Sequence, residues 1–409
     1  MAESTLVQAQ PTLARWTPET LLVAAFWLYL TLPSMVGCLA YGSRVDPSLS
    51  GSHLPVSGPL VAIFEWLTLG LLLAACLLAI LRPAGTRQRV NPGAWVAVGT
   101  PVFAVVVATI QGRGAPLSQA VILVLAVACV FLNPTRQLLR AVGVSVVTTA
   151  AVSLLMGFQG SGMVSGWNSE TKPILFGNVL AGPFPFGNSL GMALALGVPL
   201  VLVLRRRWLR WTGLAAVALA ITWSASRTAM IAAAAGLLAY ALARRVPMSW
   251  KTMTFWCGAV FAAAATVPFL GWSPETFSNR GSIWRRSVQA LQDFWFLGMP
   301  AGASPVPGEV GHGQWSLVPH STFLAAVADG GIVQALLVVV LFLCSVAAFT
   351  RTDYPAVGFA VGMAMAVNST TENILPFPPA MKTGTVVLLL LIMAASWHPH
   401  PHRQPEDAT

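Results

Sequence analysis

Charged residues are scarce in this chain: they make up 9% of its 409 residues, while 56% of the residues are hydrophobic. A soluble domain carries roughly a quarter charged residues, so this composition excludes an ordinary water-soluble protein. Apolar runs long enough to cross a bilayer recur along the chain. Because lipid requires backbone polar groups to be satisfied within their own segment, such runs favour helices. The sequence predicts an all-α polytopic membrane helix bundle.

Paired cysteines are also missing, and so are acidic pairs on the outer side. The five cysteines lie inside apolar runs and show no CxxC or CxxH spacing, which argues against a zinc site or a disulfide framework. The connections that we place on the outer side contain no DxD-like pair that could hold a metal beside a diphosphate. We therefore expect neither a metal nor another cofactor.

About twelve spans are predicted, and they divide the chain into five parts. Their approximate ranges are 20–41, 58–81, 93–110, 118–132, 138–157, 188–204, 208–223, 228–243, 250–271, 331–349, 354–368 and 380–397. We expect a cytoplasmic N-terminus at 1–19, helices 1–9 within 20–271 and a long outer loop at 272–330. Helices 10–12 follow within 331–397, and a disordered cytoplasmic tail covers 398–409.

The distribution of basic residues predicts the orientation. With the N-terminus inside, 15 of the 23 lysines and arginines fall on the inner connections, including every sizeable cluster in a short loop. This is the positive-inside pattern of a plasma-membrane protein with both termini in the cytoplasm. It also accounts for most of the net charge of +10 without a nucleic-acid partner.

The long outer loop between helices 9 and 10 is predicted to be partly helical. From Ser282 to Trp295 apolar side chains recur at helical spacing, and polar residues occupy the other face. We expect an amphipathic helix there, lying along the outer membrane boundary. A different motif, Gly187-Asn-Ser-Leu-Gly191, fits a hydrolase elbow but begins an apolar helix, so we interpret it as small residues that permit close helix packing.

A few basic residues on the predicted outer side are exceptions to the positive-inside rule. Arg227 lies in a tight link between two apolar helices, and Arg280 is the first of three arginines, with Arg285 and Arg286, in the long loop. Such arginines can simply reach lipid headgroups or water. Two or three guanidinium groups at a membrane surface also form a receptor for a diphosphate.

His320 follows near the end of the long loop. Histidine is the side chain best suited to proton transfer near neutral pH, although a loop histidine is often only a polar residue. His312 lies nearby, and the sequence alone does not choose between the two.

Taken in order, these features resemble the bacterial O-antigen ligase and polymerase superfamily of membrane glycosyltransferases. The motifs lie within about 176–376: Phe186-Gly-Asn-Ser-Leu-Gly, Trp223-Ser-Ala-Ser-Arg-Thr-Ala, Arg280-Gly-Ser-Ile-Trp with trailing glycines, His320-Ser-Thr-Phe-Leu before Asp329-Gly, and Asn368-Ser-Thr-Thr-Glu-Asn. One departure is Ser321, where the family commonly has asparagine, and this bears on contacts to the acceptor.

The resemblance implies transfer of a glycan from a polyprenyl-diphosphate carrier to an acceptor hydroxyl, on the outer face of the bacterial inner membrane and without a metal. Arg227 and Arg280 would bind the donor diphosphate, and His320 would act as general base or align the acceptor. Possible further substrate contacts are Arg285, Arg286, Ser321 and Glu372. The acceptor hydroxyl can belong to a lipid, a glycan or a protein.

Two alternatives remain open at this point. A polysaccharide polymerase would use the same carrier and differ only in its acceptor. A twelve-helix transporter or flippase is disfavoured, because Glu65 is the only acidic residue deep in an apolar run and lies in the half without a motif.

Overall fold

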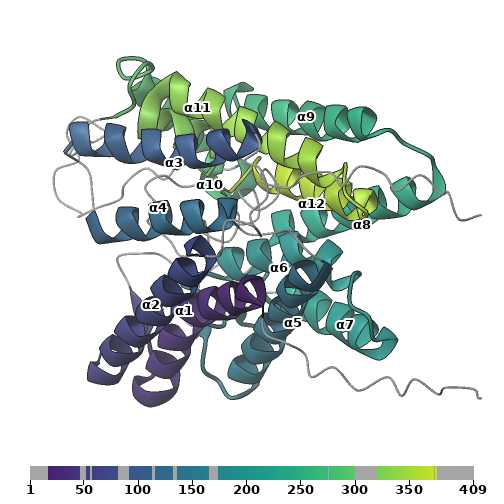
Figure 1. The fold of residues 1–409 in the computed structure, drawn as a ribbon. Coiled ribbons are helices and arrows are strands. Elements are labelled where there is room, and N and C mark those ends of the chain that lie inside the picture. The colour runs from purple at the N-terminus through teal and green to yellow at the C-terminus, as the bar shows by residue number, and fades with distance from the viewer. Residues whose placement is uncertain are drawn as a thin grey trace, which may run out of the picture.

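The computed structural model describes residues 17–46, 52–55, 58–81, 92–112, 116–131, 136–164, 174–274, 276–299, 320–372 and 374. Nearly all regular structure in these ranges is helical, which confirms the all-α prediction (Figure 1). The α-helices are α1 (Pro18–Tyr41), α2 (Pro59–Ile80), α3 (Pro92–Ile110), α4 (Pro116–Val130), α5 (Arg136–Phe158), α6 (Gly187–Val201), α7 (Arg207–Trp223), α8 (Arg227–Arg245), α9 (Trp250–Thr266), α10 (Thr276–Leu291), α11 (Thr322–Phe349) and α12 (Pro355–Asn368).

Short elements complete the fold. A 3₁₀ turn, η2 (Val267–Phe269), follows α9. The described residues also form two small antiparallel strand pairs, β1 (Ser43–Asp46) with β2 (Ser52–Pro55), and β3 (Met163–Val164) with β4 (Val179–Leu180).

Local signals in the sequence explain where several helices begin. Thr17 caps α1, because its hydroxyl accepts the backbone N–H of Thr20 while the Thr20 hydroxyl accepts the N–H of Thr17. The helices α1, α2 and α12 have proline in their first turn, where the missing N–H would have no intrahelical partner.

Six of the described helices are long and apolar enough to cross a membrane: α1, α2, α3, α5, α9 with its 3₁₀ extension, and α11. The helices α6 and α12 are apolar but shorter. These lengths and compositions are those of a multi-pass membrane protein. The count of about twelve spans stays a prediction, and the last predicted span, 380–397, lies outside the described residues, as does the predicted tail.

The long loop differs in detail from the sequence expectation. Its amphipathic helix is α10, which begins about two turns before Ser282 and ends at Leu291. The helix that re-enters the bundle begins at Thr322 instead of near 331, so the loop is shorter than predicted. The Asp-Gly-Gly sequence is therefore a kink inside α11, where Gly330 and Gly331 depart from helical dihedral angles, and does not mark the helix start.

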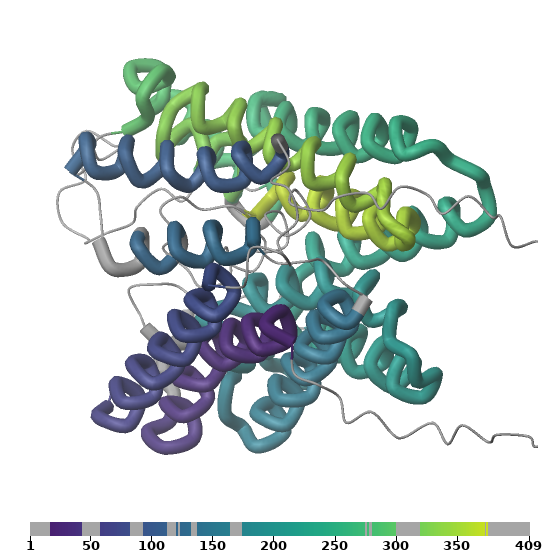
Figure 2. Tube along the Cα trace, in the orientation of Figure 1, coloured from purple at the N-terminus to yellow at the C-terminus, as the bar shows by residue number. Residues whose placement is uncertain are grey.

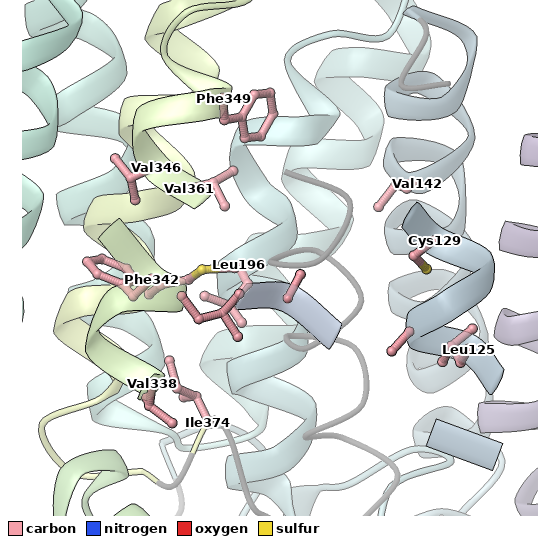
Figure 3. Packing of buried hydrophobic residues seen from close by; sticks show 14 of the residues in the cluster. Leu125, Cys129, Val142, Leu196, Val338, Phe342, Val346, Phe349, Val361 and Ile374 are labelled. Atoms are coloured by element: carbon pink, nitrogen blue, oxygen red, sulfur yellow. The ribbon is translucent and has the colours of Figure 1, made fainter. Parts of the chain in front are cut away.

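Segments far apart in sequence pack together in the core. The helix α3 lies alongside α11, and α12 lies against both α8 and α9 (Figure 2). Small residues permit this: a Cβ at Gly236 of α8 would lie 3.3 Å from Cβ of Ala364 in α12. Figure 3 shows Phe342 of α11 in the large buried cluster, which also includes Leu196 of α6 and Ile374 beyond α12.

Candidate functional site

The start of α11 is joined to the turn that follows α12. The backbone N–H of Thr322 donates to the carbonyl of Ser369 at 3.1 Å, and the Thr322 hydroxyl donates to the carbonyl of Glu372 at 3.0 Å. The same hydroxyl accepts the N–H of Ile374 at 3.1 Å. Because Ile374 is fully buried, this network fixes the position of the turn that carries Glu372.

Glu372 links two of the candidate residues. One carboxylate oxygen, Oε1, forms an ion pair with Nη2 of Arg280, and the other, Oε2, lies 3.9 Å from Nδ1 of His320. The second distance is too long for a hydrogen bond but short enough for electrostatic attraction. The ion pair is nearly buried, with side-chain exposures of 13% and 12%, whereas His320 is 38% exposed. The solvent-accessible imidazole of His320 therefore lies beside the nearly buried Arg280–Glu372 ion pair.

The helix α10 holds this arrangement from one side. Arg280 and Trp284 are four residues apart and so lie on one face of the helix. The indole N–H of Trp284, which is 1% exposed, donates to the carbonyl of His320 at 3.1 Å. One helix thereby contacts both the backbone of the histidine and the carboxylate beside it.

Arg227 is the first residue of α8, directly after a sharp link from α7. Within this link Ala225 has φ +54°, a left-handed conformation that costs an alanine roughly 1–2 kcal/mol. The link packs tightly against α6, because a Cβ at Gly191 would lie 2.6 Å from Cβ of Ser226. This close approach confirms the interpretation of the Gly-x-Ser-x-Gly motif as a packing motif.

A hydroxyl pair brings the start of α8 to the Glu372 turn. Thr228 follows Arg227, and its hydroxyl is hydrogen-bonded to that of Thr371. Arg227 itself is exposed. The structure thus brings Arg227, Arg280, His320 and Glu372 to one region, although 145 residues separate the first from the last (372 − 227).

The turn after α10 packs onto the kink in α11. The N–H of Met299 donates to the carbonyl of Ala328 at 2.8 Å, and the N–H of Ile332 donates to that of Trp295 at 2.9 Å. Gly331 has φ +71°, and a Cβ there would lie 1.8 Å from the carbonyl oxygen of Phe296. Gly331, the second glycine after Asp329, is therefore required by backbone contact with the loop.

The other predicted contacts lie in different surroundings. Arg285 is exposed and donates to the carbonyl of Trp272 at 2.9 Å, and Arg286 is exposed on the outer face of α10. Ser321 is fully buried, and its contact with a substrate stays a prediction. Ser321 and Asn368 both have buried polar side-chain atoms without a hydrogen-bond partner among the described residues. Each buried polar group without a partner lowers the folding stability by about 1–3 kcal/mol, so stability alone does not explain why these residues are polar.

His312 lies outside the described residues. Within the part of the chain that the structure describes, no group of three or more histidine, cysteine or acidic side chains is placed to hold a metal ion. A cavity between α1, α5 and α6 has an almost wholly apolar lining that includes Phe26, Trp27 and Leu194, and it contains none of the candidate residues.

Comparison with known proteins identifies no relative: no family model, curated protein or solved structure matches this chain. The site therefore rests on its own geometry. Sequence reasoning missed three features of it, namely the Arg280–Glu372 pair, the Trp284 hydrogen bond and the Thr228–Thr371 pair. For the Trp284 hydrogen bond the sequence held one local signal: Trp284 is four residues after Arg280 and so lies on the same helix face.

Proposed function

We propose that the chain is a membrane glycosyltransferase of the O-antigen ligase type. It would transfer a glycan from a polyprenyl-diphosphate carrier to an acceptor hydroxyl on the outer face of the inner membrane. The observation that carries the proposal is the meeting of Arg280, His320 and Glu372, from three separate segments, beside the first turn of α8.

The arginines supply what a diphosphate leaving group needs. As the glycosidic bond breaks, its electron pair passes to the diphosphate oxygen, and fixed guanidinium groups stabilise the developing charge. Glu372 contacts one nitrogen of the Arg280 guanidinium. A guanidinium has five N–H donors, so Arg280 can bind phosphate oxygens while the carboxylate holds its orientation. Arg227, at the exposed start of α8, would bind the same group with help from the helix N-terminus.

His320 is suited to accept the proton of the acceptor hydroxyl. Its Nδ1 faces Glu372, which leaves Nε2 for the substrate, and the carboxylate would stabilise the imidazolium that forms. The acceptor oxygen would then form its bond to the anomeric carbon as the diphosphate leaves. A single displacement of this kind inverts the anomeric centre. Glu372, first considered as a substrate contact, would instead act through Arg280 and His320.

The predicted topology agrees with this arrangement. With about twelve spans and both termini in the cytoplasm, the start of α8, the start of α11 and the end of α12 all lie on the outer side. The opposite ends of these helices carry the basic residues Arg244, Arg245 and Arg351. Carrier-linked glycans would reach the site from the outer leaflet.

The test is transfer by the purified protein, incubated with a polyprenyl-diphosphate oligosaccharide and candidate acceptors. A new glycolipid or glycoprotein supports the ligase, and a longer carrier-bound chain means a polymerase. No transfer to any acceptor, together with movement of the carrier across the bilayer, would mean a transporter. Excess chelator should leave the activity unchanged, and inhibition that magnesium reverses would refute the metal-independent reaction.

Two pairs of variants test the roles of the residues. Arg280→Lys should lose most transfer at normal expression, because an ammonium cannot contact Glu372 and a diphosphate with the same planar geometry. Arg286→Lys, on the exposed face of the same helix, is the matched control. His320→Ala should abolish transfer while His312→Ala does not, and the reverse pattern would assign the base to His312.

A further inference from the structure

A second concentration of arginine lies at the ends of α5 and α7 that are remote from the candidate site. We define the arginine cluster as the five arginines in the first turn of α5, in the link from α6 to α7 and in the first turn of α7: Arg140, Arg205, Arg206, Arg207 and Arg210. The transfer chemistry uses none of them.

Helix register brings the cluster together. A Cβ at Gly213 of α7 would lie 2.6 Å from Cγ2 of Val147 in α5, and a Cβ at Gly157 of α5 would lie 2.8 Å from the ring of Trp223 in α7. The two contacts are ten residues apart on each helix, so α5 and α7 run in the same direction and in register. Seven residues before Val147, Arg140 is therefore level with the first turn of α7.

No carboxylate among the described residues forms an ion pair with any of the five. Arg210 donates to the carbonyl of Leu204 at 2.9 Å through Nη2, which uses only part of its donor capacity. In Arg140 the Nε atom is buried and has no hydrogen-bond partner among the described residues. A buried cationic donor without a partner is costly, which points to an anionic ligand.

The surroundings indicate which kind of anion. The first turn of α7 has no side-chain cap, so its backbone N–H groups add to the positive field. Trp208 and Trp211 on α7 are 60% and 59% exposed, and tryptophan at this density beside arginine is typical of the headgroup level of a bilayer. Basic pockets between transmembrane helices bind anionic lipid headgroups.

We propose that the arginine cluster binds the phosphodiester headgroup of an anionic phospholipid. The acyl chains would lie along the apolar surface of α7 between the exposed tryptophans, and the phosphate would contact Arg140 and Arg210. This inference is independent of the transferase proposal, because it concerns other residues and a lipid that is not consumed.

The experiment measures lipid retention by the full-length protein. The protein is equilibrated in bilayer nanodiscs of phosphatidylcholine with one fifth phosphatidylglycerol and then extracted in mild detergent. Native mass spectrometry identifies the phospholipid that remains bound to it. The test variant is Arg140→Gln/Arg210→Gln. Its matched control, Arg244→Gln/Arg245→Gln, removes the same charge from the exposed last turn of α8. Arg206→Gln changes an exposed residue of the cluster. It provides a second test of the cluster in case the double variant does not fold.

The wild-type protein should retain phosphatidylglycerol over phosphatidylcholine. Affinity should fall about fivefold for each cluster arginine that is removed. The control should stay within about twofold, because Arg244 and Arg245 lie in the last turn of α8 and are not part of the cluster. Equal retention of the two lipids by the wild type, or equal losses in the test and control variants, would overturn the proposal. So would displacement of the lipid by millimolar inorganic phosphate, which would assign the cluster to a soluble anion.

Discussion

The Arg280–Glu372 ion pair is expected to hold α10 and the turn after α12 together, and Glu372→Gln tests this. Removing one partner of a buried ion pair costs about 3–5 kcal/mol. The side chains here retain 13% and 12% exposure. Glutamine can still accept one hydrogen bond from Arg280, so we expect a loss of about 2 kcal/mol.

A double-mutant cycle separates the pair from other effects of the substitution. The free energy of unfolding is measured by denaturant titration in detergent micelles for the wild type, Glu372→Gln, Arg280→Gln and the double variant. We expect a coupling energy of about 2 kcal/mol, because the second substitution removes a charge that the first already left unpaired. Arg285→Gln serves as a control and should cost less than about 0.5 kcal/mol, since that side chain is exposed.

Activity gives a second readout of the same variant. The carboxylate lies 3.9 Å from Nδ1 of His320, so its neutralisation should lower the rate of transfer more than the affinity for the donor. A coupling energy near zero, with transfer unchanged in Glu372→Gln, would refute the proposed function of the pair.

Two further predictions concern the packing around the site. Trp284→Phe keeps an aromatic ring but removes the N–H that donates to the carbonyl of His320. The kcat for transfer should therefore fall with KM little changed, and an unchanged kcat would exclude a positioning role for the indole. Gly331→Ala should destabilise the protein by about 3 kcal/mol or more, because its Cβ would overlap a backbone carbonyl. Gly42→Ala shares the positive φ but has open space, so it should cost only about 1–2 kcal/mol in the same unfolding measurement; equal losses would contradict the proposed clash.

The sequence by itself determined the class of the fold and most of its helices. Long apolar runs admit little except helices in lipid, and proline or small polar residues at their ends set where helices such as α1 and α12 begin. Arg227 and Arg280 could be selected because they are basic residues on the predicted outer side, and the family resemblance added His320. These are local properties, so they can be recognised in short stretches of sequence.

Only the tertiary structure decided which of these residues meet. Glu372 pairs with Arg280 across 92 residues, and no local pattern encodes that partnership. The same holds for the buried indole of Trp284 beneath His320 and for the kink at Gly331, which was expected to mark the start of a helix. Packing between distant helices fixes these contacts, since each depends on the position of a backbone that the neighbouring sequence does not specify.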